Sequence, residues 1–409
     1  MALTRRQFLR RSAFAAAGAG LITTPLERGA TAVVLKAPAR KVLVLGAGMA
    51  GLVAAYELTQ LGHNVTVLEA RTRPGGRVHT LREPFADGLY AEAGAARIPT
   101  NHELTLKYVK ALELPLEPFY PAELKAVRFD RGSREEVPIE GFTDAMTKNY
   151  GEDLGGRPDR WFKIKGGSDL LPKALAQKLA GKIRYGCPVV KIEQDANTAR
   201  VVFRNGGANE TVTADSVLCT IPFSVLRHID LPALPSRKRD AIKRTHYDAV
   251  SRVYLQTKNR FWEARGFNGF AFTSGAIEIW QPTWSQPGTR GILMAYTRPI
   301  EADRITKLKE NARVETTVKQ IDAIFPGTRS NFEHGLSKCW AEDEWSLGGW
   351  GFAGFGDLAT ALAPNGRIHF AGEHLSPWYS WIQGAISSSL RAVKEIDEAG
   401  YLAAATVGV

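Results

Sequence analysis

Apolar and polar positions along residues 41–69 predict a strand, a helix and a second strand in close succession. Residues 42–45 form an uninterrupted apolar run, which is typical of a strand covered on both faces. After a glycine-rich turn, the next apolar segment predicts a helix from Met49 onward, and the second strand ends at Glu69. This order is typical of an α/β domain with a parallel sheet.

Two distant segments repeat the pattern of a buried strand. The apolar run SVLCTIP around Cys219 predicts one strand. Residues 368–371 predict another, which leads through a Gly-Glu turn to a helix starting near Ile382.

Residues 266–296 contain short apolar runs that predict several antiparallel strands. In the run AIEIW, alternation places Glu278 and Trp280 on one face of a strand. Residues 305–327 then predict a helix that is stopped by Pro326 and Gly327.

The composition is that of an ordinary globular protein, with 409 residues, 44% hydrophobic and 23% charged. Residues 1–32 contain five arginines and one glutamate and so supply +4 of the net charge of +11. The other +7 is spread along the chain without a basic block, so we interpret it as a solvated basic surface. No motif predicts nucleic-acid binding.

Cysteine and histidine spacing gives no metal-ligand pattern. The three cysteines show no C-x-x-C pair and the eight histidines no H-x-x-x-H pair. We predict neither a metal site nor a disulfide scaffold.

Residues 1–32 resemble a twin-arginine export signal, with Arg5 and Arg6 followed by Phe8, Leu9 and a run rich in alanine and glycine. The apolar part is well short of the ~20 residues of a membrane-spanning helix, so no integral membrane span is predicted. Residues 29–32 offer an A-x-A-like cleavage site. We expect an exported protein, periplasmic or secreted, which would be cytoplasmic if the signal is not used. The alternative is a basic start that stays disordered.

Gly46, Gly48 and Gly51 form a G-x-G-x-x-G motif between the first strand and the first helix. The first glycine gives a tight turn, the second lets backbone approach a pyrophosphate, and the third lets the helix pack on the strand. The helix would direct its amides and positive dipole end at the phosphates. With Glu69 placed to accept ribose hydroxyls, the pattern predicts dinucleotide binding and leaves nicotinamide or flavin open.

Three further segments favour a flavin. In RTRPGGRVHT, glycines free the backbone and Arg77 supplies charge, and in YGCPVVKIEQD the backbone of Val189 could hold adenine. The helix predicted near Ile382 would direct its amino end at a flavin pyrimidine edge and stabilise the reduced ring.

Together with FKIKGGSDLLPKAL and ADSVLCTIPFSVL, these pieces resemble the flavin-containing amine oxidase family, from about Lys41 to Ile396. The resemblance implies an FAD cofactor. The positions that it assigns to the cofactor, directly or as neighbours in the same motifs, are Gly46, Gly48, Met49, Ala50, Gly51, Glu69, Ala70, Gly76, Arg77, Ala95, Ala96, Arg97, Val189, Gly372, Glu373, Trp381 and Ile382. Monoamine oxidases tether the flavin to a cysteine in the C-terminal segment, but the sequence has none between Gly372 and Gly384, so we predict non-covalent FAD.

The predicted fold class is α/β, with an FAD-binding Rossmann-like domain of the GR2 type interleaved with two other parts. We expect the FAD domain to come from residues 38–98, 163–236 and 335–409, and an α+β substrate domain from residues 237–334. Residues 99–162 are expected to form a small helical lobe with a loop-rich middle, marked by DRGSREE.

Arg97 is the main candidate for substrate binding. The segment GAARIP resembles the L-amino-acid oxidase branch of the family, in which the arginine of this motif grips the substrate carboxylate. A bidentate guanidinium clamp would fix the position and angle of an amino acid whose Cα–H faces the flavin. The alternative is an ion pair that holds the substrate domain on the FAD domain.

Aromatic residues complete the predicted site. Trp280 matches an aromatic residue that helps hold the substrate carboxylate in L-amino-acid oxidases. Ser380 and Trp381 occupy the place of a Gly-Trp pair that lies beside the substrate amine in the family. Glu278 would favour a cationic substrate if it faces the pocket and has no role if it faces solvent. For three other tryptophans, Trp262, Trp340 and Trp345, we prefer core packing.

Arg252 departs from the family, which often has a lysine at this position linked through water to the flavin. An arginine can hold a water but does not readily lose a proton. The departure bears on reactivity with dioxygen more than on amino-acid oxidation.

The sequence therefore predicts an FAD-dependent L-amino-acid oxidase whose small-molecule partners are an L-amino acid and O2. The alternatives are an amine or polyamine oxidase, an enzyme similar to tryptophan 2-monooxygenase, and a flavoprotein without turnover. The oligomeric state is left open, a homo-oligomer included.

Overall fold

The computed structural model describes residues 38–150, 160–273 and 277–405. They belong to one compact unit, Pro38–Val409. The predicted export signal, residues 1–32, lies outside the described residues. Within the described residues, no helix combines the length and apolar character that a membrane crossing requires.

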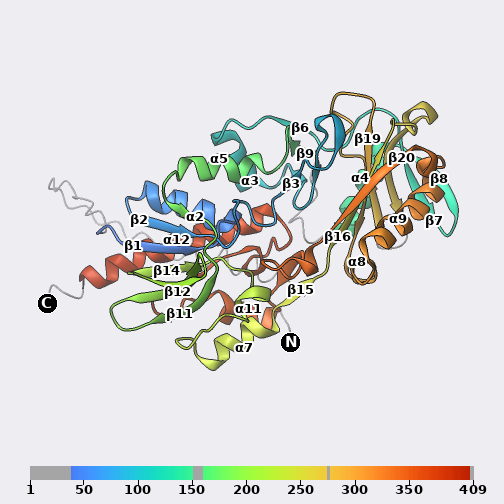
Figure 1. Ribbon diagram of the computed structural model, residues 1–409. Helices are drawn as coiled ribbons and strands as arrows, with labels where there is room; N and C mark the ends of the chain where they lie inside the picture. The colour runs from blue at the N-terminus through green and yellow to red at the C-terminus, as the bar shows by residue number, and fades with distance from the viewer. Residues whose placement is uncertain (1–37, 151–159, 274–276, 406–409) are drawn as a thin grey trace, which may run out of the picture. The chain divides into compact units, whose positions relative to one another are not determined.

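A five-stranded parallel sheet carries the glycine motif (Figure 1). Residues 42–45 and all of the neighbouring strand 216–219 are buried, as expected of strands covered on both faces. The strands predicted around residues 41–69, Cys219 and 368–371 are confirmed. In spatial order the sheet consists of β10 (Ile183–Arg184), β2 (Asn64–Leu68), β1 (Lys41–Leu45), β14 (Ser216–Cys219) and β22 (Ile368–Phe370).

Helices from both ends of the described chain cover this sheet. Helices α2 (Met49–Gln60) and α12 (Ile382–Ala405) were both predicted from the sequence, and in the structure they pack on each other (Figure 1). Helix α5 (Leu170–Lys178) packs against α2, and α3 (Glu103–Ala111) packs against α12.

A seven-stranded sheet forms the second large element of the fold. Helices α8 (Pro299–Thr306) and α9 (Glu310–Ile324) lie along it, and α10 (Thr328–Asn331) follows (Figure 1). The predicted helix in 305–327 is thus split, because α8 ends at Thr306 and the extended residue Lys309 precedes α9. In spatial order the strands are β20 (Phe332–Cys339), β16 (Ser251–Thr257), β19 (Gly291–Thr297), β18 (Ile277–Trp280), β17 (Phe267–Thr273), β7 (Lys125–Asp130) and β8 (Ser133–Val137).

The two faces of this sheet contribute to two different cores. Ile279 packs with residues of α9 such as Ile321, whereas Trp280 packs with Tyr254 and Tyr296 in an aromatic core. The alternation predicted for AIEIW is confirmed, and it places Trp280 on the face away from α9.

Strands β7 and β8 are an addition that the sequence did not predict. Residues 130–136, which we expected to be a loop within a helical lobe, form a tight hairpin that extends the seven-stranded sheet. The two turn residues Arg131 and Gly132 have φ of 47° and 85°, as a two-residue hairpin turn requires. Gly132 accepts this geometry without strain, and Ala126 and Val127 are buried in the sheet.

Smaller elements complete the fold. The strands pair as β11 (Val189–Gln194), β12 (Ala199–Asn205) and β13 (Ala208–Ala214); β15 (His246–Asp248) and β21 (Trp350–Phe352); β3 (Thr80–Leu81) and β4 (Ala91–Glu92); and β5 (Ile98–Pro99), β9 (Trp161–Ile164) and β6 (Leu116–Pro118). The other helices are α4 (Ile139–Tyr150), α6 (Phe223–Leu226), α7 (Ser236–Arg244) and α11 (Phe355–Leu362), with short 3-10 turns η1 (Ala86–Gly88), η3 (Glu263–Arg265), η4 (Trp340–Glu342) and η5 (Glu373–Leu375). The division into three interleaved domains stays a prediction.

Candidate active site

A cavity of about 600 Å³ extends from the glycine motif to the aromatic face of the seven-stranded sheet. Of the residues predicted to bind the cofactor, all except Gly51 line it, and of the predicted substrate residues all except Glu278 line it. The lining comes from segments between Gly46 and Ala385, which the fold brings together.

The glycine motif leaves open space where a phosphate would approach. A Cβ built on Gly48 meets nothing within 4 Å, whereas a Cβ on Gly51 would lie 1.9 Å from the carbonyl oxygen of Gly46. Gly51 therefore serves helix packing, as predicted, and does not line the cavity. The first amides of α2 have no acceptor within the helix and face this space.

Glu69 follows β2 at the edge of the cavity. Its Oε2 accepts a hydrogen bond from the Ala47 amide at 2.6 Å, and its Oε1 accepts one from the Arg71 amide at 2.8 Å. Burial raises the pKa of Glu69, and these two amides oppose the shift. Each oxygen keeps a lone pair, so the carboxylate can still accept hydroxyl groups of a ribose.

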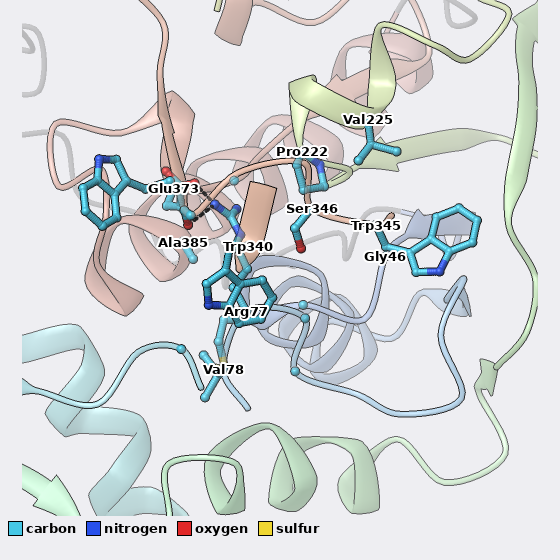
Figure 2. Close-up of a pocket in the computed structure, with 18 of the residues that line it drawn as sticks. Gly46, Arg77, Val78, Pro222, Val225, Trp340, Trp345, Ser346, Glu373 and Ala385 are labelled. Carbon is cyan, nitrogen blue, oxygen red and sulfur yellow. Dashed lines mark hydrogen bonds and ion pairs between the residues drawn. The ribbon is translucent and has the colours of Figure 1, made fainter. Parts of the chain in front are cut away.

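Arg77 and Glu373 form a part-buried ion pair on the wall of the cavity. Arg77 Nη1 donates to Glu373 Oε1 at 2.5 Å, and Figure 2 shows the two side chains joined there. Burial raises the pKa of Glu373, while Arg77 opposes the shift. Glu373 Oε2 is buried and has no hydrogen-bond partner among the described residues, so it can accept a polar group of a bound cofactor.

These features fit a dinucleotide. The cavity offers free helix amides for phosphates, a carboxylate for ribose hydroxyls and an unsatisfied acid at Glu373. Val189, predicted to hold adenine, lines the cavity next to Val190 and Arg204.

Arg97 lies between β4 and β5 at the other end of the cavity. Its side chain is only 6% exposed, and its Nη1 is 3.5 Å from Glu278 Oε2. The guanidinium carbon lies 4.6 Å from the ring centre of Trp280 and 5.9 Å from that of Trp381. Arg97 thus lines the cavity between aromatic rings and also pairs with an acid of the seven-stranded sheet.

Glu278 faces neither the cavity nor solvent. Its side chain is 1% exposed, and its Oε2 accepts a hydrogen bond from Trp280 Nε1 at 3.0 Å. Its Oε1 lies 3.7 Å from Arg298. Both carboxylate oxygens are engaged by the protein, which disfavours the hypothesis that Glu278 neutralises a cationic substrate.

Two guanidinium groups lie close to Trp280, since the Arg252 carbon is 5.0 Å from the ring centre on which Arg97 also packs. Arg252 Nη1 donates to the carbonyl oxygen of Glu92 at 2.7 Å. Burial raises the pKa of the Glu92 carboxyl to about 7. The hydrogen bond to the Glu92 carbonyl oxygen holds the charge of Arg252 in place on the cavity wall.

Ser380 and Trp381 precede α12 and line the cavity, as predicted. Ser380 has φ of 70°, a left-handed conformation that glycine favours. Trp381 packs edge-on against His102, with ring centres 5.0 Å apart.

One wall of the cavity was not predicted from the sequence. Residues 344–347, 349 and 350 line the cavity, including Trp345, for which we had preferred core packing (Figure 2). Trp340 lines the cavity while its Nε1 donates to the Ala93 carbonyl at 2.7 Å, so it is both a packing residue and a wall. Trp262 is fully buried, as expected, in the core that also contains Ile279 and Ile321. The glycine pair in SLGGW was the available signal for a backbone close to a ligand.

The family model for flavin containing amine oxidoreductase matches residues 49–150 and 139–397. The chain therefore belongs to this flavoprotein family, and the resemblance stated from the sequence is confirmed. A flavin cofactor follows from the family.

Among curated proteins, the flavin-dependent L-tryptophan oxidase of Lentzea aerocolonigenes is 31% identical, covering 88% of this chain and 98% of that protein. A putative L-amino-acid oxidase of Bacillus subtilis is 31% identical over 88% of this chain and 95% of that protein. The L-amino-acid oxidase of Demansia vestigiata is 26% identical over 88% of this chain and 87% of that protein.

Solved structures confirm the predicted fold class. Wild-type putrescine oxidase bound to putrescine superposes with a TM-score of 0.75 at 20% identity, covering 88% of this chain and 99% of the other. Cyclohexylamine oxidase from Brevibacterium oxydans gives a TM-score of 0.76 at 19% identity, with the same coverage. At this identity the likeness concerns the fold alone.

Proposed function

We propose that the protein is an FAD-dependent L-amino-acid oxidase. The observation that carries the proposal is Arg97, a buried guanidinium that lines the same cavity as the cofactor cradle and is surrounded by aromatic rings. Two of the relatives with 31% identity are named as an L-tryptophan oxidase and a putative L-amino-acid oxidase, which supports the same assignment.

In the proposed reaction, Arg97 binds the α-carboxylate of the substrate and fixes its orientation. Trp280 and Trp381 flank the amine and exclude water, which favours the neutral amine because desolvation disfavours its charged form. FAD, held non-covalently by the glycine motif, Glu69 and Glu373, would supply the acceptor for the hydride from Cα and the route by which the electrons reach O2. The amino acid, O2 and water give a 2-oxo acid, ammonia and H2O2.

One observation favours a second candidate, an amine or polyamine oxidase. Arg97 pairs with Glu278 across two of the predicted domains, as it would if its role were purely structural. An L-amino acid and its decarboxylated amine separate the two candidates, because only the first has the carboxylate that Arg97 would hold. A product analysis that finds an amide and CO2 would instead indicate tryptophan 2-monooxygenase chemistry.

The test is an anaerobic flavin-reduction screen over the twenty L-amino acids, repeated with Arg97→Ala. We expect at least one L-amino acid to bleach the flavin. The variant should lose roughly 3–5 kcal/mol of transition-state stabilisation for that substrate, by analogy with truncating one side of a desolvated charge pair. Bleaching by amines alone would reject the proposal, and no bleaching at all would indicate a flavoprotein without turnover.

We further propose that the protein is exported through its twin-arginine segment and is periplasmic or secreted. Arg5 and Arg6 in the first 32 residues support this proposal. Cell fractionation of the full chain and of an Arg5→Lys, Arg6→Lys variant tests it, since only the first should leave the cytoplasm.

A further inference from the structure

Glu278 contacts Arg97 and Trp280, two of the three residues to which the proposed function gives a role in substrate binding. Its Oε2 is 3.5 Å from Arg97 and accepts the indole hydrogen bond of Trp280 at 3.0 Å. Its Oε1 is 3.7 Å from Arg298, which lines the cavity. The acid itself does not line the cavity.

The backbone that carries Glu278 is fixed on both sides. Strand β18 lies inside the seven-stranded sheet, where Glu278 is opposite Phe272 of β17 and Tyr296 of β19. A carboxylate anchored in this way is a fixed reference point for longer side chains around it.

A second set of contacts shows that Arg97 and Glu278 belong to one packed unit. Burial raises the pKa of Tyr120 to about 12, and the charges of Arg97 and Glu278 act on this phenol in opposite directions. Phe119 lies 5.2 Å from Trp280 and 6.0 Å from Arg97. The Arg97 guanidinium is thus held by an acid and by aromatic rings.

We propose that Glu278 is a positioning residue that orients the Arg97 guanidinium and the Trp280 indole for an α-carboxylate, rather than a partner for a cationic substrate side chain. This inference rests on the proposed function. It implies two opposite effects of the Glu278 charge. The charge holds the guanidinium in place, and it also repels the substrate carboxylate that binds to the same guanidinium.

The opposite effects make the inference testable with Glu278→Gln, which keeps the size and an acceptor for Trp280 but removes the charge. With the repulsion gone, benzoate should bind to the holoenzyme roughly three- to tenfold more tightly. With the orientation loosened, the limiting rate of anaerobic flavin reduction by a neutral L-amino acid should fall roughly ten- to a hundredfold. Calorimetry measures the first and stopped-flow absorbance the second.

Glu278→Asp tests the length of the side chain separately from its charge. It retains the charge but is one methylene shorter, so we expect the slower reduction without tighter benzoate binding. The matched control is Glu333→Gln, because Glu333 pairs with Arg290 at 2.9 Å on the same sheet and does not line the cavity. The control should change neither quantity.

Three outcomes would overturn the inference. They are a Glu278→Gln variant with unchanged binding and rate, one in which benzoate binding weakens together with the rate, and one that loses turnover of L-lysine or L-arginine selectively. Benzoate binding does not require turnover, so it can be read even if no L-amino acid reduces the flavin. In that case the proposed function fails, while tighter binding in Glu278→Gln that disappears in an added Arg97→Ala still supports the contact between the two residues.

Discussion

At the scale of single residues, the substrate end of the cavity combines fixed charges with aromatic rings. Arg97 and Arg252 both pack on the ring of Trp280, and hydrogen bonds or ion pairs hold each in place. A guanidinium stays charged at every physiological pH, so the two positive charges at this end are independent of pH. Under the proposed function, this end of the cavity receives the anionic carboxylate of the substrate and holds it in one orientation.

Ser380 gives a prediction at this scale. It adopts a left-handed backbone conformation, which costs an ordinary residue roughly 1–2 kcal/mol. Ser380→Gly should therefore stabilise the fold by about 0.5–1 kcal/mol, after allowance for the greater freedom of glycine in the unfolded chain. Urea unfolding of the holoenzyme measures this. Ser133→Gly, in the extended strand β8, should be destabilising, and a loss of stability in both variants would contradict the argument.

Some site residues were predicted from local spacing alone, whereas others, such as Arg97 and Trp280, were predicted only from the family resemblance. Gly46, Gly48 and Glu69 follow from the order of one strand, one turn and one helix, which neighbouring residues determine. Tyr296 and Arg298 were missed because they line the cavity only after β19 is placed next to β18 in the sheet. The pairing of Glu278 with two arginines was missed for the same reason, since no local pattern shows which side chains meet across strands.

At the scale of elements, the turn between β1 and α2 performs two tasks with different glycines. Gly51→Ala places a methyl group 1.9 Å from a backbone oxygen, so α2 must move away from β1. Gly48→Ala meets no protein atom within 4 Å, but it fills space that a phosphate would occupy.

We therefore expect the two variants to differ. Gly51→Ala should lower the thermal stability of the apoprotein, by roughly 1–3 kcal/mol as for an overpacked core. Gly48→Ala should leave the apoprotein unchanged and weaken FAD binding. Thermal unfolding without FAD and fluorescence titration with FAD give the two readings, and equal apoprotein stability of the two variants would contradict the assignment.

The limits of sequence-based prediction at this scale are visible in the hairpin of β7 and β8. The turn Arg131–Gly132 and the short strands were present in the sequence, but the charged segment DRGSREE also fits a loop. Strand β7 becomes a strand by pairing with β17, more than a hundred residues later. The predicted helices α2, α9 and α12 needed no such distant partner to be recognised.

At the scale of the whole molecule, buried histidines make stability depend on pH. Burial lowers the pKa of His102 to about 3, and its Nε2 has no hydrogen-bond partner among the described residues. The unfolded chain binds this proton near pH 6.5 and the folded chain only near pH 3. The stability that the protein gains by keeping His102 neutral is therefore fully present above pH 6.5, and it is lost as the pH falls from 6.5 towards 3.

His102→Phe should flatten this part of the pH profile. Between pH 7 and pH 4.5 the variant should lose roughly 2–3 kcal/mol less unfolding free energy than the natural protein. Denaturant titrations at several pH values measure the difference. His246→Phe is the control, because the His246 side chain is 75% exposed, and an equal effect in both variants would contradict the role of burial.

The five-stranded sheet has a consequence for the order of events during biosynthesis. Its first strand is made near the beginning of the chain, but β22 and the acid Glu373 come more than three hundred residues later. A growing polypeptide therefore lacks part of the proposed flavin site until β22 and Glu373 have been made. We therefore expect loading of the cofactor to be a late step, after the residues that complete this site have been synthesised.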